Sequence, residues 1–392
     1  MKNTTFSFLI ALSVLCGFNF SLATSHHSQL DSFLNLMASE DRLMGSLTLS
    51  REGETTYQWS AGTAYHQLKE VRDLTADHVN SVGSVTQMIT ATAILQLAEK
   101  GILSLEATLN QFFPQIKGSE KIEIRHLLSH QSGIKNFTND PDYPYFKHRD
   151  LSRAEMLKLL SSYEVEFEPG TDWGYSNSNY LLLGYIAEMV TYKDFGQWVE
   201  KNIFSPLEMT HTFMSFHDIP KEKKTHSFIK TYDDWATYTP ETSRAIAFTA
   251  GGLYSTGRDL NAFMHALFSG ELLLESSLKL MTEGHMGYSM GLISMEFNGK
   301  TAYGQIGQID GYHTASIYFP DQKIGMQLLL NGLNCNFSEL ISEVVHSIVE
   351  GGSHGSDMSR FGQNESTLRN ATNTFQNVIE QTNYPSQVDE KG

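Results

Sequence analysis

Ser84 is the residue of this chain whose position best suits nucleophilic chemistry. Gly83 permits a sharp backbone turn before it, and apolar residues then recur with helical period up to Gly101, namely Met88, Ala91, Ile94, Leu95 and Ala98. At the start of a helix, free backbone N–H groups and the positive end of the dipole favour developing negative charge. A plain helix N-cap is the alternative role for such a serine. The stretch therefore predicts a buried helix opened by Ser84.

The text from Gly83 onward, GSVTQMITATAILQLAEKGILSLEATL, resembles the active-site helix of the serine β-lactamase and penicillin-binding protein superfamily. The similarity is greatest to the branch of class C β-lactamases, D-alanyl-D-alanine carboxypeptidases and esterases. In that family the serine is the acylated nucleophile, and a lysine follows one helical turn later as S-x-x-K. This chain has Gln87 at the lysine position. The resemblance thus implies a catalytic Ser84 beside a substituted proton-handling residue.

A second motif, Y-x-N, is intact at Tyr175, Ser176 and Asn177, within the text EPGTDWGYSNSNYLLLGYIAEMV. In the family the tyrosine hydroxyl faces the nucleophile and serves in general-base catalysis, and the asparagine amide binds the substrate. The alternative for a Tyr-Ser-Asn between a Pro-Gly turn and a helix is a helix cap. The resemblance implies a catalytic Tyr175 and a substrate-binding Asn177.

The third motif of the family is written K-T-G or H-x-G and lies on a strand beside the nucleophile. This chain has Gln305, Ile306 and Gly307 there, followed by Gln308. In the family the oxyanion hole uses the backbone N–H of the nucleophile and that of the residue after the motif's glycine, which here are Ser84 and Gln308. Backbone donors survive side-chain substitution. The resemblance therefore places Gln305, Gly307 and Gln308 on the substrate side of the site.

Further segments that resemble the family occur in the family's order, and the resemblance covers most of residues 45–331; they read KIEIRHLLSHQSGI, NIFSPLEMTHTFM and TAGGLYSTGRDLNAFMHALF. The first contains His126 and His130, whose i, i+4 spacing places two imidazoles on one face of a helix and suggests a metal. No acidic residue stands between them as in a zinc-protease helix, and the family uses this segment structurally. We expect no metal and no cofactor.

Gln87 and Gln305 each replace a basic side chain of the family by a neutral amide. The family's lysine either accepts the serine proton or, as an ammonium, helps the tyrosine to do so, whereas the amide of Gln87 has no basic nitrogen. Gln305 removes a cation that would bind a substrate carboxylate, so neutral esters or amides are the expected small-molecule or peptide-like substrates. Two hypotheses remain: a weak exported serine hydrolase acylated at Ser84, or a catalytically inactive relative that binds a peptide, glycan or partner protein in the cleft.

The fold class that follows from the resemblance is α/β (α+β), with an antiparallel sheet flanked by helices and a mostly helical insert. An amphipathic helix is expected at residues 29–37, and a β-hairpin is expected from the alternation at residues 45–59. The β-lactamase-like domain is predicted over residues 28–350. Its sheet part comprises about 28–83 and 250–350, and its helical part about 101–243, with the active site at the seam. A loop rich in Asp, Pro and Tyr at residues 139–149 could cover the cleft.

Composition and the chain ends limit the partners and the compartment. With 28 Lys and Arg against 44 Asp and Glu, the formal net charge is −16, and no basic block is dense enough for nucleic acid. Residues 1–23 have the basic start, short apolar core and small-residue end of a cleaved secretory signal, so we expect a periplasmic or secreted protein without a membrane anchor. Residues 351–392 are polar and expected to be disordered. The sequence carries no signal for an oligomeric state.

Overall fold

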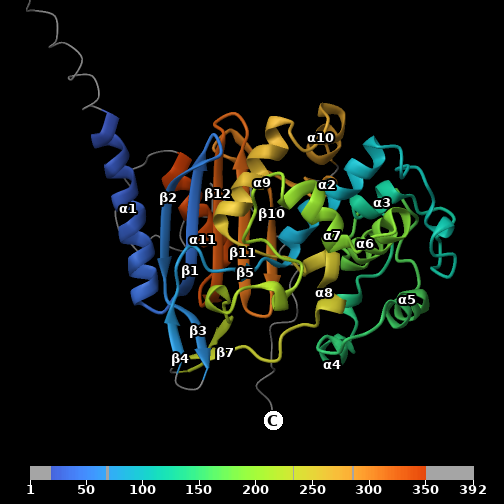
Figure 1. Cartoon of the computed structure of the whole chain (residues 1–392), viewed down its shortest axis with the longest axis horizontal. Helices are drawn as coiled ribbons and strands as arrows, with labels where there is room; N and C mark the ends of the chain where they lie inside the picture. Colours follow the sequence, from blue (N-terminus) through green and yellow to red (C-terminus); the bar gives the residue numbers. More distant parts are fainter. Residues whose placement is uncertain (1–18, 68–69, 233, 285–286, 350–392) are drawn as a thin grey trace, which may run out of the picture.

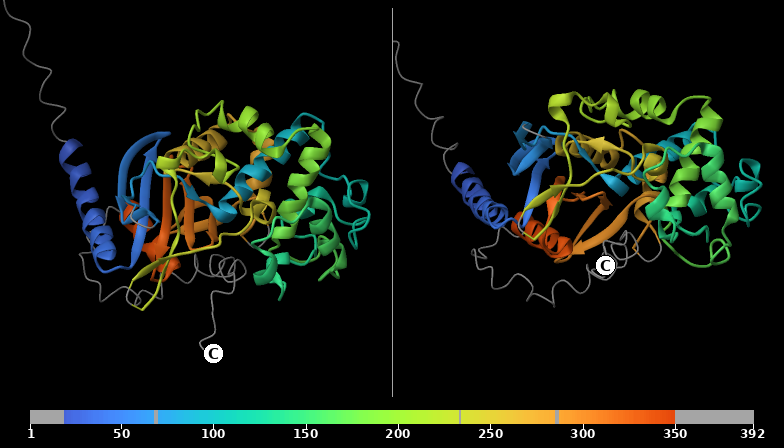
Figure 2. Two further views of the ribbon diagram at one scale, coloured as in Figure 1. Left: turned by 60° about the horizontal axis from the view of Figure 1, so that its bottom comes forward. Right: turned by 90° about the horizontal axis from the view of Figure 1, so that it is seen from below.

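A computed structural model describes residues 19–67, 70–232, 234–284 and 287–349, with no side-chain detail for residues 19–27. The expected signal segment therefore lies mostly, and the expected disordered tail entirely, outside the described residues. An antiparallel sheet occupies one side of the molecule and a helical part the other (Figures 1 and 2). This arrangement confirms the predicted antiparallel sheet flanked by helices. Within the described ranges, no helix is both long and apolar enough to span a membrane.

The main sheet has the order β2-β1-β12-β11-β10-β9, with antiparallel pairing throughout this path. Its strands are β1 (Leu43–Arg51), β2 (Glu54–Ala61), β9 (Ile293–Phe297), β10 (Lys300–Ile309), β11 (Tyr312–Phe319) and β12 (Ile324–Leu333). Strand β1 and strand β12 are buried almost along their whole length, because helices cover both faces of the sheet. The predicted hairpin corresponds to β1 and β2.

Helices α1 (Asn19–Ser39) and α11 (Phe337–Val349) cover one face of the sheet and contact each other. In α1 the buried residues Leu30, Leu34 and Met37 recur at helical spacing and pack into the same apolar cluster as the sheet. Helix α9 (Gly257–Ser269) covers the other face, against β1 and β12. The sheet is therefore enclosed between helices, and one end of β10 contacts the helical part.

The helical part is built around α2 (Thr86–Glu99), whose residues from Thr86 to Leu97 are all buried. It packs against α6 (Asn177–Thr191) and α8 (Arg244–Gly251). The other helices in the described chain are α3 (Ile124–Leu128), α4 (Tyr143–Phe146), α5 (Arg153–Ser162), α7 (Phe195–Val199) and α10 (Glu275–Thr282). Because α2 is buried on every side, it forms the centre of this part of the core.

Short strands connect the helical part with the sheet. Strand β6 (Phe228–Lys230) pairs with β7 (Trp235–Thr237) and lies parallel to β12. Both fall inside the range 101–243, so the chain returns to the sheet before α8 begins. The remaining small pairs are β3 (Thr63–Gln67) with β4 (Glu70–Asp73) and β5 (Asn80–Ser81) with β8 (Tyr254–Ser255).

Candidate active site

Ser84 lies in a short 3₁₀ turn, Gly83–Val85, that leads directly into α2. Its hydroxyl does not cap the helix: it accepts a hydrogen bond from the Tyr175 hydroxyl at an Oγ to Oη distance of 2.7 Å. Tyr175 comes from the loop before α6 and is buried. The helix start and the Y-x-N motif, 91 residues apart, thus meet at one pair of hydroxyl groups.

Gln87 lies one turn after Ser84 and is fully buried. Its amide nitrogen is 2.6 Å from the Tyr175 hydroxyl oxygen and 3.1 Å from Oδ1 of Asn177. The carbonyl oxygen of Ala250, 3.5 Å away, completes the acceptors around this nitrogen. Gln87 therefore occupies the place next to Ser84 and Tyr175 that the helical spacing predicted for it.

Strand β10 approaches the Ser84 turn so closely that side chains are excluded there. A Cβ atom added to Gly307 would lie 1.9 Å from the carbonyl oxygen of Val82 and 3.0 Å from the backbone nitrogen of Ser84. One added to Gly83 would lie 2.9 Å from the backbone nitrogen of Gln308. The backbone nitrogens of Ser84 and Gln308 thus lie on neighbouring segments, as a two-donor oxyanion hole requires.

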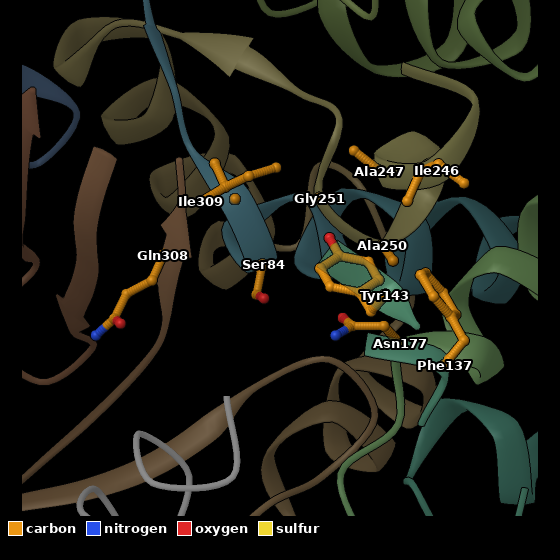
Figure 3. Close-up of a pocket in the computed structure, with 11 residues that line it drawn as sticks. Ser84, Phe137, Tyr143, Asn177, Ile246, Ala247, Ala250, Gly251, Gln308 and Ile309 are labelled. Atoms are coloured by element: carbon orange, nitrogen blue, oxygen red, sulfur yellow. The ribbon is translucent and has the colours of Figure 1, made fainter. Parts of the chain in front are cut away.

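A pocket opens at Ser84 between β10 and the helical part (Figure 3). Its lining includes the glycines and backbone beside Ser84, Asn177 and Gln308, together with the apolar or aromatic residues Phe137, Tyr143, Ile246, Ala247, Ala250 and Ile309. In the close-up, the Ser84 side chain lies between Gln308 and Asn177, and the Gln308 side chain extends away from it. The pocket is narrow, with room for about one water molecule.

Gln305 is buried and does not belong to the described lining of this pocket. Its amide nitrogen donates to the Tyr288 hydroxyl at 3.2 Å, and its amide oxygen accepts from the backbone N–H of Ile306. Tyr288 in turn donates to the Gln87 amide oxygen at 3.1 Å. Gln305 is therefore connected to Ser84 through Tyr288, Gln87 and Tyr175, while its role in substrate binding remains a prediction.

The helical spacing assumed for His126 and His130 was wrong. Helix α3 ends at Leu128, and His130 has a positive φ of 56° that turns the chain out of the helix. His126 caps α3, since its Nδ1 accepts from the backbone N–H of Glu123, whereas His130 is buried beside Gln87. In the part of the chain that the structure describes, no group of three or more His, Cys, Asp or Glu side chains could hold a metal ion.

Two residues of the site were not predicted as functional. His130 lies 3.3 Å from the Gln87 amide oxygen, and Tyr288 contacts both Gln87 and His130. His130 lies in a segment that resembles the family, but the spacing suggested only a metal ligand. For Tyr288 the sequence offers no signal, because it reaches Gln87 across 201 residues of chain.

Burial keeps His130 uncharged. It lowers the pKa of the imidazole to about 3. Burial also raises the pKa of Tyr288 well above its usual value. At neutral pH, His130 and Tyr288, which contact Gln87, are therefore uncharged hydrogen-bonding partners.

This neutrality predicts acid instability. In the unfolded chain a histidine ionises near pH 6.5, while folded His130 stays neutral to about pH 3, so its contribution is present above pH 6.5 and is lost as pH falls. Between pH 7 and pH 5 we expect His130 to account for about 2 kcal/mol of lost stability. Urea unfolding at both pH values should show a smaller loss for His130→Gln than for wild type. An unchanged loss in the variant would contradict the assignment.

The comparisons with known proteins agree with this geometry. Residues 32–341 match the model of the Beta-lactamase family, so the chain belongs to that family and is related to its serine hydrolases. The superfamily resemblance of the motifs is thereby confirmed.

Individual relatives are more distant. PbpX of Bacillus subtilis (strain 168), described as a penicillin-binding protein, is 25% identical over 272 residues, which are 69% of this chain and 65% of PbpX. Esterase EstB of Burkholderia gladioli is 30% identical over 207 residues, 48% of this chain and 52% of EstB. The chain thus spans roughly half to two thirds of the length of these two relatives.

Solved structures show the same fold over nearly their whole length. A D-stereospecific amidohydrolase from Streptomyces sp. superimposes with a TM-score of 0.71 at 25% identity, covering 84% of this chain and 99% of that one. The D-amino acid amidase from Ochrobactrum anthropi SV3, complexed with L-phenylalanine amide, gives 0.73 at 24% identity with the same coverage. The predicted β-lactamase/DD-peptidase-like fold is confirmed.

Proposed function

We propose that the protein is a serine hydrolase that transfers the acyl group of a neutral ester or amide to Ser84 and then to water. The observation that carries this proposal is the 2.7 Å contact between the Tyr175 and Ser84 hydroxyl groups at the mouth of a pocket. For this step the Tyr175 O–H, which donates to Ser84 in the structure, would turn toward the leaving group. Ser84 Oγ would then form a bond to the carbonyl carbon and give its proton to the Tyr175 oxygen, while Tyr175 gives its own proton to the leaving group, whose bond to the carbon breaks. Water would then cleave the acyl-serine ester and release a carboxylic acid.

The pocket supports an uncharged acyl group as the substrate. The residues opposite Ser84 are apolar or aromatic, and Phe137, Tyr143 and Ile246 are almost completely buried. An apolar lining of this kind favours an uncharged acyl group over a charged one. The esterase and the D-stereospecific amidohydrolase among the similar proteins support the reaction class.

The proposed activity is weak, because Gln87 cannot act as a base. The amide donates a hydrogen bond to the Tyr175 oxygen, which is a smaller stabilisation of a phenolate than an ammonium gives. Loss of general-base assistance typically costs on the order of 10²- to 10⁴-fold in rate. An activated ester, whose leaving group needs little protonation, should therefore be the best substrate.

Covalent labelling tests the nucleophile. A fluorophosphonate probe is expected to label wild-type protein at Ser84 and to leave Ser84→Ala unlabelled, because phosphonylation requires the same attack by Oγ. Ser176→Ala is a matched control: this buried hydroxyl lies in the Y-x-N motif and makes no hydrogen bond in the structure. Labelling of Ser176→Ala should equal that of wild type, as measured by intact mass spectrometry.

The second candidate function is ligand binding without turnover. The neutral network around Gln87 favours it, since a binding cleft needs no base. Folded wild-type protein that acquires no adduct after prolonged incubation would support binding of a peptide, glycan or partner protein and would contradict the hydrolase proposal.

A further inference from the structure

The surroundings of His130 hold its neutral imidazole in one tautomer. Its Nδ1 atom lies 3.2 Å from the backbone nitrogen of Ser176. A backbone N–H can only donate, so Nδ1 must carry the lone pair. The neutral imidazole then has its proton on Nε2. His130 is completely buried.

Asn179 supports the same assignment from a second direction. The Ser132 hydroxyl accepts the N–H of Ile134, so its own proton is free to donate to Asn179 Oδ1, at 2.6 Å. With its oxygen bound in this way, Asn179 turns its NH₂ group toward His130 Nδ1, at 3.2 Å. A backbone donor and a side-chain donor from the start of α6 therefore converge on Nδ1.

The opposite edge of the ring sets the orientation of Gln87 together with the Tyr288 hydroxyl, which donates to the Gln87 amide oxygen at 3.1 Å. Nε2 of His130, which carries the proton, lies 3.3 Å from the Gln87 amide oxygen and 3.1 Å from the Tyr288 oxygen. The NH₂ group of Gln87 then points away from His130, toward Tyr175 and the Ala250 carbonyl. A flipped amide would place NH₂ against the Nε2 proton and its oxygen against the Ala250 carbonyl oxygen, which are two unfavourable contacts in a buried site.

We propose that His130 is a positioning residue: through its Nε2 proton it fixes the Gln87 amide as a hydrogen-bond donor to Tyr175, which contacts Ser84. This inference rests on the proposed acylation of Ser84. The site is accordingly built for an amide at position 87, since that position must accept on the His130 side and donate on the Tyr175 side. Neither an ammonium nor a carboxylate does both.

The first measurement concerns the tautomer and does not depend on activity. In the full-length protein labelled with ¹⁵N-histidine, the ring nitrogens of His130, assigned by their loss in His130→Gln, should show Nδ1 unprotonated and Nε2 protonated at pH 7. A proton on Nδ1 would overturn the inference. The side-chain NH₂ resonances of Gln87 should shift in His130→Phe, which leaves Tyr288 as the one described donor to the Gln87 amide oxygen, and stay closer to wild type in His130→Gln, whose side-chain amide can supply an N–H in place of Nε2.

The second measurement separates positioning from packing. We expect the maximal rate of fluorophosphonate labelling to fall about tenfold in His130→Phe and less than about threefold in His130→Gln, with half-saturating probe concentration unchanged. Equal losses in both folded variants would show that His130 is only structural and would overturn the inference. If wild-type protein is not labelled at all, the proposed function fails, and the Gln87 resonances decide: a shift confined to His130→Phe supports the positioning role, and equal or absent shifts refute it.

Discussion

Tyr175→Phe is expected to reduce the rate at which Ser84 is acylated by about 10²-fold or more, the typical size of general acid–base assistance. The Tyr175 hydroxyl is the group that contacts Ser84 Oγ, and it also receives the hydrogen bond of Gln87. Phenylalanine fills the same buried space and removes only that oxygen. The variant should therefore fold normally and keep the pocket while losing the path for the serine proton.

A suitable assay is the hydrolysis of p-nitrophenyl acetate, with the rate of Ser84→Ala subtracted as background. Tyr180→Phe is the matched control, because Tyr180 is also a buried tyrosine of this region, and its hydroxyl donates to the Leu128 carbonyl at 2.8 Å. The control should lose some stability and little activity. If Tyr175→Phe and Tyr180→Phe retain the same activity, Tyr175 takes no part in proton transfer and the proposed mechanism must be abandoned.

The sequence predicts the sheet, the buried α2 and the convergence of three motifs because each depends on local patterns or on family order. The S-x-x-K resemblance predicted position 87 one helical turn after Ser84, and the amide nitrogen of Gln87 lies 2.6 Å from the Tyr175 hydroxyl oxygen. The third motif predicted Gly307 by resemblance, and the structure gives the physical reason for a glycine there: an added Cβ atom would lie 1.9 Å from the carbonyl oxygen of Val82. Such features depend on the residue type or spacing itself, so they can be recognised without coordinates.

The partners behind Gln87 could not be predicted, because they depend on where chain segments end and return. His130 was expected on a helix, and its positive φ after the end of α3 instead directs it to the core. Tyr288 approaches from a segment between α10 and β9 that carries no family motif in the sequence. The predicted cover over residues 139–149 gave no hint that Tyr143 in particular would line the pocket. These contacts join segments that are distant in the sequence, so no periodic pattern of residues predicts them.

The second large effect expected is a gain: Gln87→Lys should raise ester hydrolysis at least about tenfold, a barrier lowered by about 1.4 kcal/mol. The Gln87 nitrogen already lies near the oxygens of Tyr175, Asn177 and Ala250, which are three acceptors for the three N–H bonds of an ammonium. A buried lysine beside Tyr175 can either accept the serine proton or stabilise the phenolate.

The same substitution removes the amide oxygen that accepts from His130 and Tyr288, so the variant should be less stable by about 1 kcal/mol. The His130 Nε2 proton can still bond to the Tyr288 oxygen, 3.1 Å away, which limits the loss.

Gln87→Met, similar in length but without donors, is the matched control and should show no gain. Ser84→Ala combined with Gln87→Lys measures any reaction of the new amine itself. A folded Gln87→Lys protein no faster than wild type, or a gain that persists without Ser84, would show that the cleft is not a weakened acyl-transfer site, and its motifs would then have to be explained by binding.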